Sequence, residues 1–155
     1  MKKSVWGPYI WTLLHCFTMR IKEDHFIEER SNILKYISLI CDNLPCPNCA
    51  LHATQYLRKY NFNHIKTKES LINVIFHLHN DVNKRTKKTE FKKEELNGSY
   101  DKYNFQKVII NYINMSHRIN YGEKMMLYTF KRREFLKNLL DYFKQNIHKY
   151  NNIIE

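Results

Sequence analysis

Glycine and proline are scarce in this sequence, with 3 residues of each among 155. β-Sandwiches, β-barrels and glycine-rich nucleotide loops need turn residues in quantity, so this scarcity argues against all three. Long apolar runs are missing as well. The uncharged stretch 4–19 is shorter than the roughly 18 apolar residues that span a bilayer, and no apolar leader follows Met1. We therefore expect one mostly helical domain, with no membrane span, that is soluble and not exported.

Negative charge is also in short supply, since 26 lysines and arginines stand against 15 aspartates and glutamates, a net charge of +11. Such an excess suits a polyanionic partner such as nucleic acid, a phosphate-bearing cofactor or an acidic protein. It is equally typical of a solvated, lysine-rich surface. Hydrophobic residues make up 43% of the chain, which is enough for a packed core.

Apolar residues recur at helical spacing in four early segments. Asp24 and Thr67 are expected to cap the second and fourth helices. Pro45 is expected to stop the second helix, and Pro47 to open the third. The predicted stripes are Ile10, Leu13, Leu14 and Phe17; Ile33, Ile37, Ile40 and Leu44; Ala50, Ala53, Thr54 and Leu57; and Leu71, Val74, Ile75, Leu78 and Val82.

After these segments the pattern breaks into a basic run over 83–93, and Asn97-Gly98-Ser99 predicts a turn. Another helix is expected around Phe105, Val108, Ile109 and Tyr112. After Tyr121-Gly122 a long helix is expected from Met125 to Ile147, with a stripe of Leu127, Phe130, Leu136, Leu139, Leu140 and Phe143. The predicted fold is all-α, a bundle of four or five helices over 1–100 with a helical C-terminal extension over 101–155.

The tetrapeptide Cys46-Pro47-Asn48-Cys49 opens a predicted helix. Unpaired N–H groups and the helix dipole stabilise a thiolate there. Two intervening residues place the sulfurs on one turn, where they can close a small disulfide ring that Pro47 stiffens. A strained disulfide with one exposed sulfur readily accepts another protein's thiolate.

Three alternatives fit the same tetrapeptide. Cys46, Cys49 and His52 have the spacing of zinc ligands, although a second Cys-x-x-Cys is missing. A thioredoxin-like domain would need β-strands ahead of the motif, where 33–44 is predicted helical. Two inert buried thiols are the third alternative. Spacing alone leaves the choice open.

Aromatic and polar side chains elsewhere in the sequence help to choose among these interpretations of the tetrapeptide. Trp6 and Trp11 flank the start of the first predicted helix, where aromatics cap a core or stack on a flat heterocycle. His79, Asn80 and Asn83 share one helical turn and lead into the basic run. Such a patch can hold a sugar hydroxyl and a pyrophosphate without a glycine loop. Taken singly, His79 is equally typical of a helix surface.

Three motifs, in order and in register over about 3–100, together resemble the ERV/ALR sulfhydryl oxidases. They are Trp-Gly-x-x-x-Trp-x-x-Leu-His over 6–15, Leu-Pro-Cys-Pro-Asn-Cys-Ala-x-His over 44–52, and His-Asn-x-Val-Asn-Lys-Arg-x-x-Lys-x-x-Phe over 79–91. The Leu-Pro-Cys-Pro-x-Cys form is most similar to members from large cytoplasmic DNA viruses. Among the interpretations of the cysteine pair, the resemblance favours the redox-active disulfide of a sulfhydryl oxidase.

The resemblance implies a bundle that holds FAD, forms a homodimer, oxidises protein dithiols and passes the electrons to O2, giving H2O2. It makes Cys49 the flavin-proximal sulfur and Cys46 the outer sulfur, attacked by a thiol-bearing protein or a thioredoxin-like carrier. Departure of the Cys49 thiolate is expected to be easy, because it lies at a helix start. The cofactor residues implied by position are Trp6, Gly7, Tyr9, Trp11, His15, His52, Phe76, His79, Asn80, Val82, Asn83, Lys84, Arg85, Lys88, Phe91 and Tyr100.

The sequence departs from the family in two places. The cellular members' structural Cys-x16-Cys corresponds here to Phe76 and Lys93, so that staple is absent, and no second shuttle pair exists. Cys16 is expected to be a buried free thiol, although a bridge from Cys16 to Cys41 is the alternative. The resemblance also implies a location in the host cytoplasm and the virion.

Two other functions compete with the oxidase. A nucleic-acid-binding module would use the basic run 84–93 as its phosphate contact, but it leaves the cysteine spacing as coincidence. A catalytically dead scaffold would give no reason to keep both cysteines. We therefore expect an FAD-linked thiol oxidase with no resident metal and no need for nucleic acid.

Overall fold

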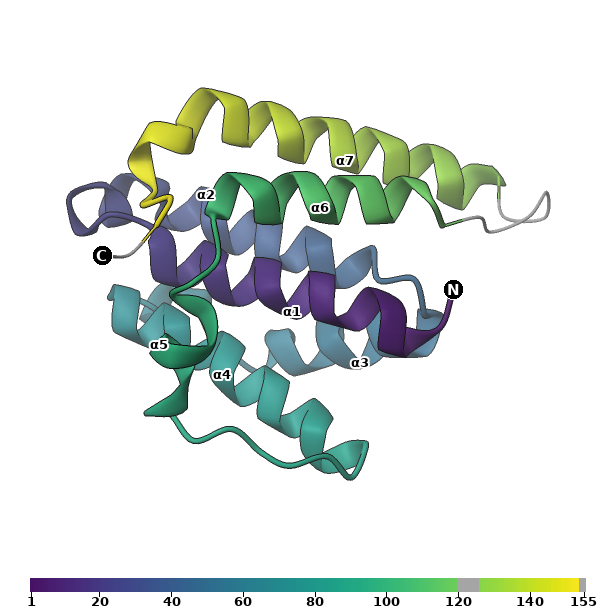
Figure 1. The fold of residues 1–155 in the computed structure, drawn as a ribbon, viewed down its shortest axis with the longest axis horizontal. Helices are drawn as coiled ribbons and strands as arrows, with labels where there is room; N and C mark the ends of the chain where they lie inside the picture. The colour runs from purple at the N-terminus through teal and green to yellow at the C-terminus, as the bar shows by residue number, and fades with distance from the viewer. Residues whose placement is uncertain (120–125, 154–155) are drawn as a thin grey trace.

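The computed structural model describes residues 1–119 and 126–153, and over this part of the chain it is all-α, with no β-strand (Figure 1). The all-α prediction is therefore confirmed. The helices are α1 (Lys3–Arg20), α2 (Glu23–Asp42), α3 (Pro47–Arg58), η1 (Phe62–His64), α4 (Lys68–Arg85), α5 (Glu95–Tyr100), α6 (Phe105–His117), α7 (Met126–Asn146) and η3 (Ile147–Lys149).

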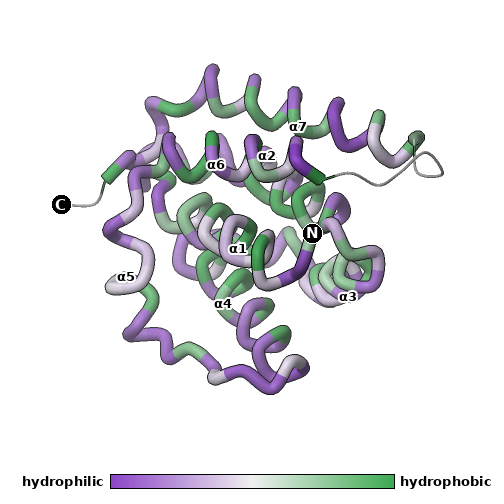
Figure 2. Tube along the Cα trace, turned by 45° about the vertical axis from the view of Figure 1, so that its right-hand side comes forward, coloured by the Kyte–Doolittle hydropathy of each residue, from purple (hydrophilic) through white to green (hydrophobic). Residues whose placement is uncertain are grey.

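Helix α1 is the centre of the molecule. It packs against α2, α4, α5 and α6, and Figure 2 shows it ringed by the other helices. Its predicted stripe of Ile10, Leu13, Leu14 and Phe17 is buried, with exposed fractions of 3% or less. Burial of four such side chains contributes on the order of 6–12 kcal/mol before entropic costs, so this helix is the main core-forming element.

The predicted starts of α3 and α4 are confirmed. Pro47 is the first residue of α3, where its missing N–H costs nothing. Thr67 caps α4, and its hydroxyl and that of Ser70 each accept a hydrogen bond from the other residue's backbone N–H. Pro47 and the Thr67 cap thus fix where the two helices that carry predicted site residues begin.

Two local predictions are wrong. Asp24 does not cap α2, because the helix begins one residue earlier and Asp24 lies in its first turn. Its carboxylate there complements the helix dipole instead. The segment Asn97-Gly98-Ser99 is not a turn but part of α5. Burial of Leu96 and Tyr100 favours the helical conformation over the local turn preference.

The C-terminal helices lie together on one side of α1 and α2, with α6 against α1 and α7 alongside α6 (Figure 1). The helix predicted around Phe105 is α6, and the long final helix is α7. Leu136, Leu139 and Phe143 are buried as predicted, whereas Leu127 and Phe130 are 86% and 62% exposed. The apolar stripe is therefore buried only in the second half of α7. The predicted Tyr121-Gly122 break and Met125 lie outside the described residues.

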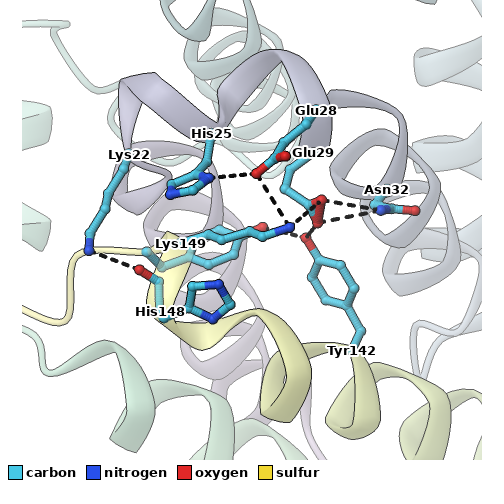
Figure 3. A network of polar contacts seen from close by, with 9 residues as sticks. Lys22, His25, Glu28, Glu29, Asn32, Tyr142, His148 and Lys149 are labelled. Carbon is cyan, nitrogen blue, oxygen red and sulfur yellow. Dashed lines mark hydrogen bonds and ion pairs between the residues drawn. The ribbon is translucent and has the colours of Figure 1, made fainter.

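A buried polar network ties the end of the chain to α2 (Figure 3). The Tyr142 hydroxyl donates to Glu29 Oε1 at 2.9 Å, and Lys149 Nζ lies 3.3 Å from Glu29 Oε2. Tyr142 also shares a 2.7 Å hydrogen bond with the Tyr150 hydroxyl. A buried carboxylate needs such partners, so this network holds α7 and η3 against α2.

Helix α7 also reaches the loop that precedes the cysteine pair. Arg132, which is 3% exposed, donates to the Asn43 carbonyl at 2.8 Å just after the end of α2. The helices of 101–155 thus contact the predicted oxidase bundle along its length, while the proposed domain division at residue 100 stays a prediction. No helix of the described residues is long and apolar enough to cross a membrane.

Candidate functional site

A cavity of about 870 Å³ lies between the start of α1, the start of α3, the second half of α4 and the segment 86–103. This volume is in the range of small-molecule and cofactor sites. Both cysteines of the tetrapeptide line it. So do eleven predicted cofactor residues: Trp6, Gly7, Trp11, His52, His79, Val82, Asn83, Arg85, Lys88, Phe91 and Tyr100.

Five predicted cofactor residues do not line the cavity. Tyr9 is 39% exposed, and Lys84 is also exposed. Phe76 is half-buried beside the His77 ring. His15 and Asn80 lie behind the wall, where they hold residues that do line it. Their cofactor roles stay predictions.

The cavity also has lining residues that none of the three motifs marks as cofactor-binding. They include Cys41, which is 1% exposed, and Thr86, Thr89 and Tyr103. The motifs do not mark these four residues. Thr86 and Thr89 stand at unspecified positions of the third motif, Tyr103 lies beyond it, and Cys41 is a single cysteine ahead of the second motif. Only folding brings Cys41 from α2 to the cavity.

The cysteine pair sits at the start of α3. Cys46 is the residue that caps this helix, and its Sγ accepts a hydrogen bond from the Cys49 backbone N–H at 3.3 Å. Both side chains are half-buried and both are free thiols in this structure. The pair thus joins a helix N-terminus to the cavity.

The two thiols differ in acidity. Burial tends to raise the pKa of Cys46, but hydrogen bonds from the Cys49 thiol and from backbone N–H groups, with the charge of Lys3, bring it below its ordinary value. Burial and the hydrogen bond to Cys46 raise the pKa of Cys49. The sequence predicted that Cys49 would leave easily as a thiolate, but the pKa of Cys46 is lowered and that of Cys49 is raised. Cys46 is therefore the cysteine that loses its proton first.

A stack of rings forms one side of the cavity. The Trp11 indole lies parallel to His79, with centroids 3.9 Å apart and an interplanar angle of 7°. His79 Nδ1 and His15 Nε2 share a 2.8 Å hydrogen bond, and His15 in turn stacks on Tyr100 at 4.4 Å. One histidine donates and the other accepts, so the accepting histidine must be neutral.

The histidine pair is held neutral by its surroundings. Burial, followed by the neighbouring His79, lowers the pKa of His15 to about 3. Burial, followed by the charge of Lys88, lowers the pKa of His79 to about 4. At neutral pH the pair therefore adds an uncharged polar surface to the aromatic wall.

Asn80 acts behind the wall rather than on it. Its side-chain amide donates to the Phe91 carbonyl at 2.9 Å and accepts from the Phe91 N–H at 2.8 Å. This pairing fixes the segment after α4 against the helix. Phe91 is thereby set beside His79, with ring centroids 4.9 Å apart.

Polar and charged side chains line another part of the cavity. His52 Nε2 lies 2.8 Å from Asp81 Oδ2, which ties α3 to α4. Arg85 and Lys88 lie at the far end of α4 and just beyond it. A flat heterocycle fits the ring stack, and guanidinium and ammonium groups bind phosphate oxygens. The residues present therefore fit FAD, which combines both kinds of group.

The remaining two cysteines, Cys16 and Cys41, are not part of the pair at the start of α3. Cys16 is fully buried and free, as expected, and burial, with smaller effects from charged neighbours, raises its pKa to about 11. Cys41 is also free, so the alternative bridge between the two is not formed in this structure. Among the described residues no group of three or more His, Cys, Asp or Glu side chains is arranged to hold a metal ion.

Comparison with known proteins points in the same direction. Residues 8–106 match the sequence model of the Erv1 / Alr family. Two relatives named FAD-linked sulfhydryl oxidase, from the Tick/Malawi and Pig/Kenya isolates of African swine fever virus, are each 30% identical over 96 residues, which is 62% of this chain and 80% of the relative. A relative from Invertebrate iridescent virus 3 is 26% identical over 88 residues, or 56% of this chain and 60% of that protein.

Proposed function

This chain belongs to the Erv1 / Alr family, and from that premise we propose how its own residues perform the chemistry. The protein is an FAD-linked thiol oxidase. The observation that carries the mechanism is the opening of the Cys46 and Cys49 side chains into the ring-lined cavity. That arrangement supports disulfide exchange at one end and cofactor binding at the other.

In the oxidised enzyme, where Cys46 and Cys49 are joined by a disulfide, the first step is attack on that disulfide by a substrate thiolate. A bond forms between the substrate sulfur and Cys46, the bond between the two cysteines breaks, and the electron pair leaves on Cys49. The position of Cys46 as helix cap puts this sulfur at the α3 N-terminus. Lys3, whose charge lowers the pKa of both thiols, supports the negative charge that then develops on Cys49.

The second step resolves the mixed disulfide. The second thiol of the substrate, after losing its proton, attacks the substrate sulfur, and Cys46 leaves with the electron pair. A thiol of low pKa is a better leaving group, and Cys46 is the sulfur with the lowered pKa. The substrate has then lost two electrons and two protons, and the cysteine pair holds the electrons.

Bound FAD supplies the acceptor for these two electrons, with O2 as the final oxidant and H2O2 as its product. We place FAD in the cavity, where Trp11, His79 and Tyr100 offer ring faces and Arg85 and Lys88 offer cations. Asn80 holds the wall segment in place. The protein's part is thus placement, charge balance and exclusion of water.

Further aspects of the proposal rest on the family resemblance alone. The substrate is a thiol-bearing protein or a thioredoxin-like carrier, since no shuttle cysteine pair is present in the sequence. The enzyme is a homodimer that works in the host cytoplasm and the virion. Sedimentation equilibrium of the purified protein tests the dimer, and trapping of mixed disulfides in infected cells tests the substrate and the location.

A nucleic-acid-binding module is not favoured. In the basic run, Arg85 and Lys88 line the cavity, and Lys93 pairs with Glu69 on α4. These cations are therefore partly committed to contacts within the protein. Binding to DNA that weakened with salt and ignored Cys46→Ala would favour the module after all.

The test of the proposed function is spectroscopic and kinetic. The purified protein is expected to carry a flavin absorption band and to consume O2 when a dithiol such as dithiothreitol is added. Cys49→Ser is expected to keep the flavin band and lose the oxidation. A colourless protein that takes up no FAD, or a Cys49→Ser variant with full activity, would contradict the proposal.

A further inference from the structure

Arg20, the last residue of α1, is a fully buried cation outside the cavity. Its Nη2 donates to the carbonyl oxygens of Tyr100 at 2.8 Å and Tyr103 at 2.7 Å. Its Nη1 donates to the Asn152 carbonyl at 2.5 Å. One planar guanidinium therefore joins two segments that are far apart in sequence, which the single ammonium of a lysine cannot do with the same geometry.

The first of these segments, 100–103, is a wall of the cavity. Both Tyr100 and Tyr103 line it. The Tyr100 ring stacks on His15, and His15 is hydrogen-bonded to His79 at 2.8 Å. A shift of this segment would therefore move Tyr100 and, through His15, change the position of His79 in the ring stack.

The second segment is 151–152, which we call the C-terminal tail. It is held by hydrogen bonds to α1 and to α6. The Asn151 N–H donates to the Arg20 carbonyl at 2.7 Å. The Asn152 carbonyl also accepts from the Phe105 N–H at 2.9 Å, and its side-chain oxygen accepts from the Gln106 N–H at 2.9 Å. In Figure 1 the tail accordingly lies where α1 ends and α6 begins.

The hydrogen bonds make these parts interdependent. A buried guanidinium without its acceptors is strongly unfavourable, so Arg20 keeps its place only if both sets of carbonyls stay in position. The tail, through Arg20, thus restrains the same segment that shapes the cavity.

We propose that Arg20 is a positioning residue for the cofactor cavity, through which the C-terminal tail holds the Tyr100 and Tyr103 wall in its binding conformation. This inference rests on the proposed place of FAD in the cavity. It assigns residues 151–152 a part in cofactor binding, although they do not line the cavity themselves.

The experiment compares FAD affinity among full-length variants, measured by titration of flavin-free protein at a temperature where circular dichroism shows each one folded. Arg20→Met removes the donors and keeps the aliphatic stem, and Arg20→Lys keeps the charge. Tyr36→Phe is the matched control, because it removes the hydrogen bond from a buried tyrosine of α2 to the Asn138 carbonyl of α7 and touches neither 100–103 nor the C-terminal tail. Affinity measured on folded protein does not respond to a loss of global stability.

Arg20→Met is expected to raise the Kd for FAD at least tenfold and to change the visible circular dichroism of the bound flavin. Arg20→Lys is expected to have an intermediate Kd, and Tyr36→Phe to have a Kd within twofold of that of the unaltered protein. If Arg20→Met does not fold, the same criterion applies to Arg20→Lys. An unchanged Kd in the folded arginine variant overturns the inference alone, whereas an unaltered protein that binds no FAD overturns the proposed function and the inference with it.

Discussion

The buried histidine pair makes stability depend on pH in a defined direction. The pKa of His15 is lowered to about 3 and that of His79 to about 4, both mainly by burial. In the unfolded chain both titrate near pH 6.5. The unfolded state therefore binds protons first as the pH falls, so stability is complete above about pH 6.5 and is lost progressively toward pH 4 and 3.

The magnitude follows from linkage. Between about pH 6.5 and pH 5 each histidine spans roughly 1.5 pH units, at about 1.4 kcal/mol per unit. The loss is about 2 kcal/mol for each residue and about 4 kcal/mol for the pair, since both are 7% exposed or less. Most carboxylates titrate below about pH 5, so the loss of stability between about pH 6.5 and pH 5 comes mainly from the histidines.

Urea unfolding of the flavin-free protein at pH 7.5 and pH 5 measures this difference. His15→Gln and His79→Gln are each expected to lower the pH-dependent loss by about 2 kcal/mol, whatever they do to absolute stability. His77→Gln is the matched control, because His77 is an exposed histidine on the same helix. The same loss in all four proteins would refute a neutral buried pair.

Three further outcomes are expected. Given the disulfide form of a dithiol substrate, Cys49→Ser should attack it through the Cys46 thiolate, release one substrate thiolate and stay joined to the other sulfur as a mixed disulfide visible by mass spectrometry. Cys46→Ser should trap none, and capture by both variants alike would contradict the assigned roles. Tyr142→Phe should lower the free energy of unfolding by about 1–2 kcal/mol through loss of buried hydrogen bonds, and a change near zero in urea titration would count against the network. Asn80→Ala should weaken FAD binding by freeing Phe91, and an unchanged Kd would show that the pairing is dispensable.

Much of the fold follows from local sequence chemistry. The burial of Ile10, Leu13, Leu14 and Phe17 follows from their spacing, and Thr67 caps its helix through its own hydroxyl. The helical conformation of Gly98 in α5 does not follow in this way. Gly98 has a strong turn preference, and only contacts with distant parts of the chain show that burial of neighbouring side chains decides its conformation.

The candidate site was predictable where motifs supply both residue type and spacing. Trp11, His79 and the cysteine pair all meet at one cavity. Residues behind the wall were harder to assign, since a motif does not distinguish a side chain that lines a cavity from one that supports the lining. Asn80 supports the lining by holding Phe91. The role of Arg20 cannot be predicted from a residue pattern, because its hydrogen-bond partners are all backbone carbonyls.

A crystal structure of the protein purified with FAD tests the central claim most directly. The account predicts an isoalloxazine ring inside the cavity, next to Cys49 Sγ and within the walls formed by Trp11, His79 and Tyr100. Flavin density elsewhere on the molecule, or a Cys49 sulfur turned away from the ring, would contradict it.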